Sequence, residues 1–168
     1  STHCISSAAS DVYKRQFDGY YEKKWFPYTM PISDIYGLRQ AFDNIKNDPY
    51  MLERHAKIGN AVRAAVKEAG LELYQETGFS NTVTVFNVPE GTTDTAILTA
   101  MKEKCNIMLA GSFGAFAGKV IRIGHMGENA YPEKVGAVMA GLDLVFKDLG
   151  ITLKCSLKEA YDRKMSEQ

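Results

Sequence analysis

The apolar segments of this chain follow one another at short intervals, and this spacing limits how they can be arranged. Apolar residues three or four apart predict helices, and alternating runs predict strands. The predicted elements are helix 33–47, helix 50–69, strand 71–74, strand 82–88, helix 93–104, strand 107–109, strand 119–123 and helix 131–149. Most connections are too short for the crossover that joins parallel strands. The order predicts an α+β fold, with a small, mainly antiparallel sheet and helices packed on one face.

Capping and breaking residues set the expected helix boundaries. Ser33 and Thr92 are expected to cap the helices that follow them, because a hydroxyl can accept a hydrogen bond from a free N–H of the first turn. Pro132 suits the first turn of the last long helix. Gly70 and Gly150 are expected to end the helices before them.

Composition indicates a globular protein and argues against two classes of partner. The chain has 168 residues, of which 45% are hydrophobic and 24% charged. This length suits one domain of ordinary size or a small domain with extensions. Its 20 basic and 20 acidic residues leave a net charge of zero. No basic field is present to hold nucleic acid. No apolar run approaches the roughly 20 residues that span a bilayer, so neither nucleic acid nor membrane is expected as a partner.

Cysteines and histidines show no spacing typical of a metal site. Cys4, Cys105 and Cys155 are scattered and form no CxxC pair, and no two of the three histidines are close in sequence. We therefore expect free thiols, a reducing cytoplasmic location and no metal.

Four segments are expected along the chain. Residues 1–16 are assigned no function. They are either an ordinary flexible N-terminus or a non-native leader, since DVYKRQ resembles a reading frame of a transposon end used in sequencing libraries. Residues 17–31 are rich in aromatics and contain Pro27 and Pro31, which predicts an extended loop that packs on another domain, another subunit, a ligand or this domain's own core. Residues 32–150 form the main domain, and residues 151–168 are a charged tail with room for one short helix.

The glycine-rich stretch 111–118 separates two predicted strands. Its glycines do not match GxGxxG, and a strand follows where a dinucleotide-binding fold needs a helix. A flexible turn that approaches another surface closely is favoured over a phosphate-binding loop.

The next strand contains Arg122 among apolar residues, in KVIRIGHMG. A guanidinium in such a place needs a partner. Its donors fit a carboxylate through two parallel hydrogen bonds, and that carboxylate belongs either to a ligand or to an acidic residue of the chain. His125, just past the strand, is expected to be a hydrogen-bonded surface or core histidine rather than a catalyst.

Several motifs in order resemble the C-terminal part of the class V pyridoxal-phosphate aminotransferases, above all those of the alanine–glyoxylate and serine–pyruvate type. The motifs are WFPYTMPISDIYGLRQAFDNI, ERHAKIGNAVRAAVKEAGLEL, GFSNTVTVFNVPEG and IMLAGSFGAFAGKVIRIGHMG, followed by an acidic, valine-rich helix. The resemblance covers about residues 18–150. It implies the small C-terminal domain of a fold-type I enzyme, seated on a large cofactor domain in a homodimer.

The resemblance also implies roles for particular residues. Arg122 matches the arginine of the family's R-I-G motif, which binds the substrate carboxylate. Thr29 matches the threonine of a T-x-P loop that reaches the cofactor phosphate of the neighbouring subunit. The tyrosine that many relatives carry three residues earlier is Phe26 here, so Tyr28 is the candidate to replace its hydroxyl.

The family's cofactor-binding lysine motif has no match in this chain. No catalytic residue is therefore expected within it, and the chain alone is expected to be inactive. The resemblance implies a fragment of an enzyme that moves an amino group from alanine or serine to glyoxylate or pyruvate, with pyridoxal 5'-phosphate bound mainly by the large domain. Two alternatives remain: a related class V phosphonate transaminase or lyase, and a non-catalytic dimerisation or binding module.

Overall fold

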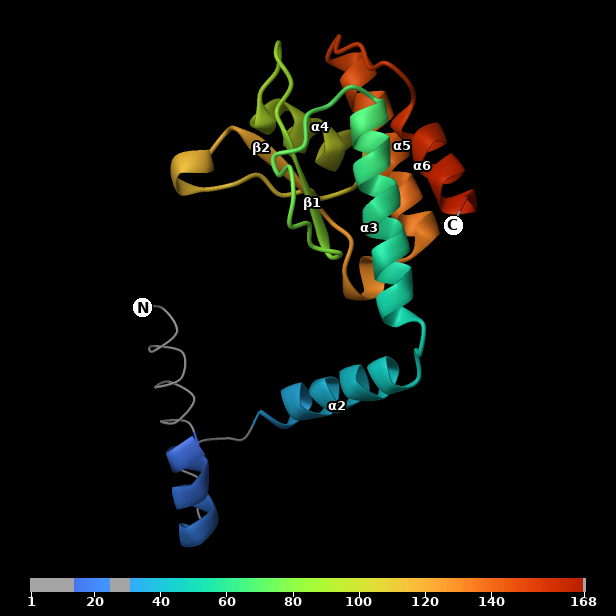
Figure 1. Ribbon diagram of the computed structural model, residues 1–168. Coiled ribbons are helices and arrows are strands. Elements are labelled where there is room, and N and C mark those ends of the chain that lie inside the picture. Colours follow the sequence, from blue (N-terminus) through green and yellow to red (C-terminus); the bar gives the residue numbers. More distant parts are fainter. Residues whose placement is uncertain (1–13, 25–30, 168) are drawn as a thin grey trace. The chain divides into compact units, whose positions relative to one another are not determined.

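The structure is a computed structural model that describes residues 14–24 and 31–167. Contacts divide the chain into two units, residues 1–48 and 49–168 (Figure 1). Each unit is described by itself. The predicted boundaries after residues 31 and 150 differ from this division, which falls at the Asn47-Asp48-Pro49 break predicted between two helices.

The first unit contains two helices in its described residues. One covers residues 14–23, where the sequence predicted an extended loop from residue 17. That part of the prediction was wrong, because a proline restricts only its own position and the residue before it. Phe17, Tyr20 and Tyr21 lie well ahead of Pro27 and are therefore free to form a helix.

The second helix of this unit, α2 (Ile32–Lys46), exposes its apolar stripe. Its N-cap is Pro31 and no side chain caps it, so the expected cap by Ser33 is absent. Ile35, Leu38, Phe42 and Ile45 share one face as predicted, yet no residue of α2 is buried and Phe42 is 63% exposed. A stripe of this kind is typical of a helix that packs on another surface.

The second unit contains a small antiparallel sheet. Strand β1 (Val83–Asn87) pairs with β2 (Val120–Gly124), and Val85 lies opposite Arg122. The predicted strand at 71–74 is reduced to a single bridge, Leu73 with Phe86. Residues 107–109 form no strand, and a single bridge follows them, Ala110 with Arg122. Both bridges are antiparallel and extend the sheet on either side, so the α+β prediction with an antiparallel sheet is confirmed.

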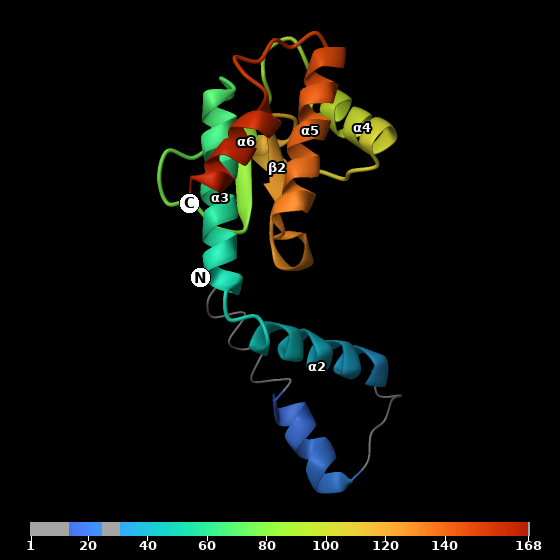
Figure 2. The same cartoon turned by 90° about the vertical axis from the view of Figure 1, so that its right-hand side faces the viewer.

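Helices cover one face of this sheet. Helix α3 (Met51–Glu68) packs on β1 and on α6 (Leu157–Ser166), and α5 (Pro132–Asp148) packs on α6 and on α4 (Asp94–Cys105) (Figures 1 and 2). Thr84, Phe86, Ile121 and Ile123 share the covered face and are buried. The Phe86 and Phe146 rings meet edge to face, with centroids 6.4 Å apart.

The C-terminal residues are part of this core rather than a separate tail. Leu157, Ala160 and Tyr161 of α6 are buried, and the Tyr161 hydroxyl donates to the Pro132 carbonyl at 3.3 Å. Charge dominated the sequence here, but three apolar side chains at helical spacing are enough to seat a ten-residue helix.

Two helices of the second unit begin close to where the sequence predicted. Thr93, not Thr92, caps α4: its backbone is extended and its hydroxyl accepts from the Ala96 N–H at 3.2 Å. Pro132 begins α5 as predicted.

Among the described residues no helix is both long and apolar enough to cross a membrane.

Candidate functional site

Arg122 lies at the centre of β2, on the face of the sheet that the helices leave open. Successive strand residues point to opposite faces, and its neighbours Ile121 and Ile123 are fully buried on the helix side. Arg122 is half-buried and lies opposite Val85 of β1. On its other side, the Arg122 N–H donates to the Ala110 carbonyl at 2.7 Å. The backbone of this residue is therefore held between two neighbouring segments.

The guanidinium of Arg122 is held at one end only. Its Nε donates to the Gly111 carbonyl oxygen at 2.7 Å. Within residues 14–24 and 31–167, neither Nη atom of Arg122 takes part in a hydrogen bond or an ion pair. The structural ion pair with an acidic residue, one of the two partners considered from the sequence, is therefore not seen within that part of the chain. The two Nη groups retain the forked geometry that matches a carboxylate.

His125 is a core histidine, which is one of the two locations predicted for it. The side chain is fully buried. Its Nδ1 lies 3.1 Å from the Asn81 carbonyl and its Nε2 lies 2.9 Å from the Thr84 hydroxyl. Because a carbonyl can only accept, Nδ1 carries the proton and Nε2 accepts from Thr84. Burial lowers the pKa of His125 from 6.5 to about 4, so the ring is neutral at pH 7.

The loop after β2 is fastened to α3. The Gly127 N–H donates to Nε2 of His55 at 3.2 Å, and Nδ1 of His55 lies 2.7 Å from the Met51 carbonyl. Arg54 donates from Nε to the Ala130 carbonyl at 2.8 Å and stacks on the Tyr131 ring. These contacts fix the chain directly beyond the end of the Arg122 strand. They were missed from the sequence, because the bonds to the loop join α3 side chains to backbone groups far along the chain.

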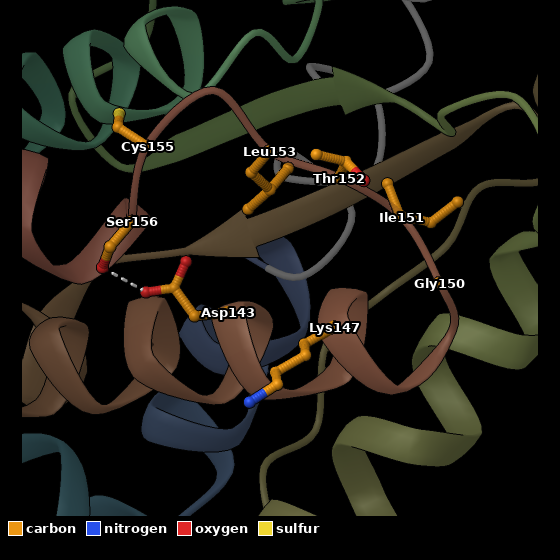
Figure 3. Close-up of a pocket in the computed structure, with 8 residues that line it drawn as sticks. All are labelled: Asp143, Lys147, Gly150, Ile151, Thr152, Leu153, Cys155 and Ser156. Carbon is orange, nitrogen blue, oxygen red and sulfur yellow. Dashed lines mark hydrogen bonds between the residues drawn. The ribbon is translucent and has the colours of Figure 1, made fainter.

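A hollow of about 450 Å³ lies elsewhere, between the end of α5 and the start of α6 (Figure 3). Its lining residues are Asp143, Lys147, Gly150, Ile151, Thr152, Leu153, Cys155 and Ser156. Asp143 accepts from the Leu157 N–H at 2.7 Å, from the Ser156 hydroxyl at 2.6 Å and from the Lys158 N–H at 3.0 Å. Its charge thus caps α6, where an anion is favourable. The Asp143 carboxylate in this hollow therefore has a structural role.

The other predicted features fall outside the site or the described residues. Thr29 and Tyr28, predicted to touch the cofactor phosphate, lie outside the described residues, as does Phe26. No lysine within the described ranges is buried. Those ranges also hold no group of three or more His, Cys, Asp or Glu side chains that could bind a metal ion.

Comparisons with known proteins identify what this chain resembles. No protein-family model matches it. An uncharacterized aminotransferase of Methanocaldococcus jannaschii is 37% identical over 146 residues, which make up 85% of this chain and 37% of that protein. Serine–glyoxylate aminotransferase of Arabidopsis thaliana is 36% identical over 130 residues, covering 75% of this chain and 32% of that protein.

A solved structure agrees with these sequence relatives. The crystal structure of pyridoxamine–pyruvate aminotransferase from Mesorhizobium loti superposes with a TM-score of 0.77 and 29% identity, over 85% of this chain and 38% of that chain. The chain thus spans about a third of the length of the curated relatives it matches. Over that part, the similarity to the C-terminal region of class V aminotransferases is confirmed.

Proposed function

Because the chain is homologous to a C-terminal part of class V aminotransferases, we propose that it supplies the substrate-carboxylate site of such an enzyme. The complete protein moves an amino group from a small amino acid, alanine or serine, to a 2-oxo acid, glyoxylate or pyruvate. The observation that carries this proposal is the guanidinium of Arg122, which is fixed through Nε while neither Nη atom has a hydrogen-bond or ion-pair partner in the described ranges.

The open face of the sheet is where the rest of the enzyme fits. Helices cover the face that carries Phe86 and Ile121, while the side chains of Val85 and Arg122 lie on the other face and are only partly buried. A large domain seated over that face removes water from around Arg122. Ionic hydrogen bonds strengthen when water is excluded, so closure there strengthens the grip on a carboxylate.

The described residues do not fit the covalent site of pyridoxal phosphate. The cofactor aldehyde needs a lysine in a desolvated place, and no lysine within those ranges is buried. No chemical step is therefore assigned to this part of the chain. Its task is to bind and orient the substrate carboxylate, while the cofactor, held by the missing large domain, supplies the amino-group chemistry.

The substrate assignment is limited to a class. One relative is named for serine and glyoxylate and one solved structure for pyridoxamine and pyruvate. Each name includes a small 2-oxo acid, glyoxylate in one and pyruvate in the other, whereas the amino donors differ. A carboxylate-binding arginine suits every 2-oxo acid and every amino acid donor, so Arg122 does not choose between alanine and serine.

A homodimer in the cytoplasm is the assembly proposed for the complete protein. Thr29, with Tyr28, contacts the cofactor phosphate of the neighbouring subunit. Subunit mixing tests this: one subunit lacks the cofactor lysine and the other carries Thr29→Val. If the contact is made across the interface, the mixed dimer has one complete site and binds cofactor normally. If mixing restores no cofactor binding, Thr29 does not act in trans.

The proposed reaction is tested on the complete protein, expressed with the sequence that precedes this chain in its gene. Alanine and serine are each supplied with glyoxylate or pyruvate, and the new amino acid is measured. We expect transamination with at least one pair. Turnover of a phosphonate or a lyase substrate instead would favour the related class V reaction. An upstream start codon with no cofactor domain would indicate a free-standing, non-catalytic module.

A further inference from the structure

Gly111 is the residue that holds the side chain of Arg122, and its carbonyl defines which edge of the guanidinium faces the substrate. An arginine can grip a carboxylate end-on, through its two Nη atoms, or side-on, through Nε and one Nη. The 2.7 Å bond from Nε to the Gly111 carbonyl occupies the side-on edge. We propose that Gly111 is a positioning residue that commits Arg122 to end-on binding of the substrate carboxylate, an inference that rests on the function proposed above.

The carbonyl of Gly111 is placed by the sheet. Ala110 and Arg122 form an antiparallel bridge, with the Arg122 N–H donating to the Ala110 carbonyl at 2.7 Å. Gly111, the next residue in the chain, therefore lies beside the guanidinium. The bridge leaves its carbonyl within reach of Nε.

A close approach of the chain to α4 requires glycine at this position. A Cβ added at Gly111 would lie 3.3 Å from Oδ2 of Asp94 and 3.3 Å from Cδ1 of Leu98. Such contacts are tighter than ordinary van der Waals packing, so the chain or its neighbours must shift by a few tenths of an ångström.

The neighbours of Gly111 are each held by a contact of their own, although both are only partly buried. Asp94 lies in the first turn of α4, and its Oδ1 accepts from the Thr95 N–H at 2.7 Å. Leu98 is packed against the core, and Ile97 beside it is fully buried. An added methyl group therefore moves residue 111 rather than α4, and the carbonyl moves with it.

Kinetics on the complete enzyme test the inference. Gly111→Ala is compared with Arg122→Ala and with a matched control, Gly136→Ala in α5. The control adds the same methyl group at a similar distance, 3.2 Å, but against the flexible end of Lys158. Cofactor affinity and thermal midpoint report on folding in all three variants.

We expect Gly111→Ala to lower kcat/KM for the amino acid by about 10-fold, through KM rather than kcat, since small displacements of a positioned group cost up to two orders of magnitude. Acetate, used as a competitive inhibitor, should weaken in parallel because it probes the carboxylate contact alone. Gly136→Ala should change neither value. If Arg122→Ala lowers kcat/KM while Gly111→Ala does not, the positioning role is wrong and the proposed function stands. If Arg122→Ala has no effect, the proposed function fails as well.

A measurement on the unmodified protein covers the case in which Gly111→Ala does not fold. The Arg122 Nε–H resonance is followed by nitrogen-15 NMR during a titration with acetate. End-on binding predicts slow exchange of the Nε proton, an almost constant Nε shift and moving Nη resonances. A large Nε shift at saturation, or exchange as fast as in free arginine, would overturn the inference.

Discussion

Two arginines of the second unit, Arg63 on α3 and Arg122 on β2, use their guanidinium groups in opposite ways. Arg63 is buried: its Nη1 donates to the Ser80 carbonyl at 2.8 Å, its Nη2 to the Asn60 side chain at 2.6 Å, and its head stacks on Phe79. Arg122 is half-buried and bonded through Nε alone. A glycine lies against the Arg63 head and another supplies the carbonyl that holds Arg122, namely Gly59 and Gly111.

The difference separates a structural from a ligand-binding arginine more clearly than burial alone. The strand sequence marks Arg122 as a charge among apolar residues, but it does not show whether that charge serves structure or a ligand. What distinguishes them is which nitrogens are engaged. Both Nη atoms of Arg63 form hydrogen bonds within the protein, whereas those of Arg122 form none with the residues that the structure describes.

The largest expected effect is on catalysis, from Arg122→Ala in the complete enzyme. Removing one partner of a buried charge pair costs about 2–5 kcal/mol, which corresponds to roughly 30-fold to several thousand-fold in kcat/KM. Arg122→Lys should recover little, because one ammonium cannot make the forked contact. Equal losses for amino acids and for amines without a carboxylate would assign Arg122 to structure, like Arg63.

Acid should destabilise the region around Arg63 through protonation of His125. This histidine hydrogen-bonds to Asn81 and Thr84, which lie near the partners of Arg63. Its folded pKa of about 4 lies below its ordinary value of 6.5. Above pH 6.5 its full contribution is present. As pH falls through 6.5 toward 4, the unfolded chain takes up the proton first, and stability falls by about 3 kcal/mol in total.

Urea unfolding at pH 6.5 and pH 5 measures this loss in wild type and in His125→Gln. The variant lacks the titrating ring, so its stability should fall less over the same interval. Both proteins contain Arg54, Arg63 and His55. The difference between their slopes of stability against pH therefore reports on His125. Parallel slopes would contradict the lowered pKa.

Arg63→Met should reduce stability and leave substrate selection alone. Arg63 is buried, and losing its two hydrogen bonds, to the Ser80 carbonyl and the Asn60 side chain, costs about 1–3 kcal/mol. The check is the urea midpoint, together with kcat/KM of the complete enzyme. A selective rise in KM for amino acids, with no loss of stability, would reverse the roles assigned to the two arginines.

The smallest effect is expected from Asn60→Ala, which removes one acceptor of Arg63. Asn60 is exposed, so water can replace the lost oxygen, and the cost should be about 1 kcal/mol or less. A loss as large as that of Arg63→Met would mean that the whole contribution of Arg63 passes through this single contact.

Local patterns predicted most of the second unit. Helices α3, α4 and α5 and strands β1 and β2 lie within two residues of their predicted bounds, because each has a clear apolar period and a breaking residue at its end. Arg122 was likewise found from the sequence, as a charge inside an apolar strand. The packing of α6 was missed, since its three buried residues stand among charged ones.

The features that sequence reasoning missed depend on contacts between distant residues or on the limits of a rule. The carbonyl of Gly111 and the hold of His55 and Arg54 on the loop after β2 involve backbone atoms, which leave no residue-specific signal. The helix over 14–23 was missed because the influence of Pro27 was extended too far along the chain. The close approach predicted for the glycine-rich stretch is found at Gly111, where it meets α4.

The most direct test of the central claim is a crystal structure of the complete enzyme with a bound substrate carboxylate. We expect its two oxygens to lie at about 2.7–2.9 Å from the two Nη atoms of Arg122, the usual distance for a charged hydrogen bond. Nε should remain on the Gly111 carbonyl and Arg63 should be unchanged. A carboxylate bound away from Arg122, with both Nη atoms paired to an acidic residue of the protein, would contradict the claim.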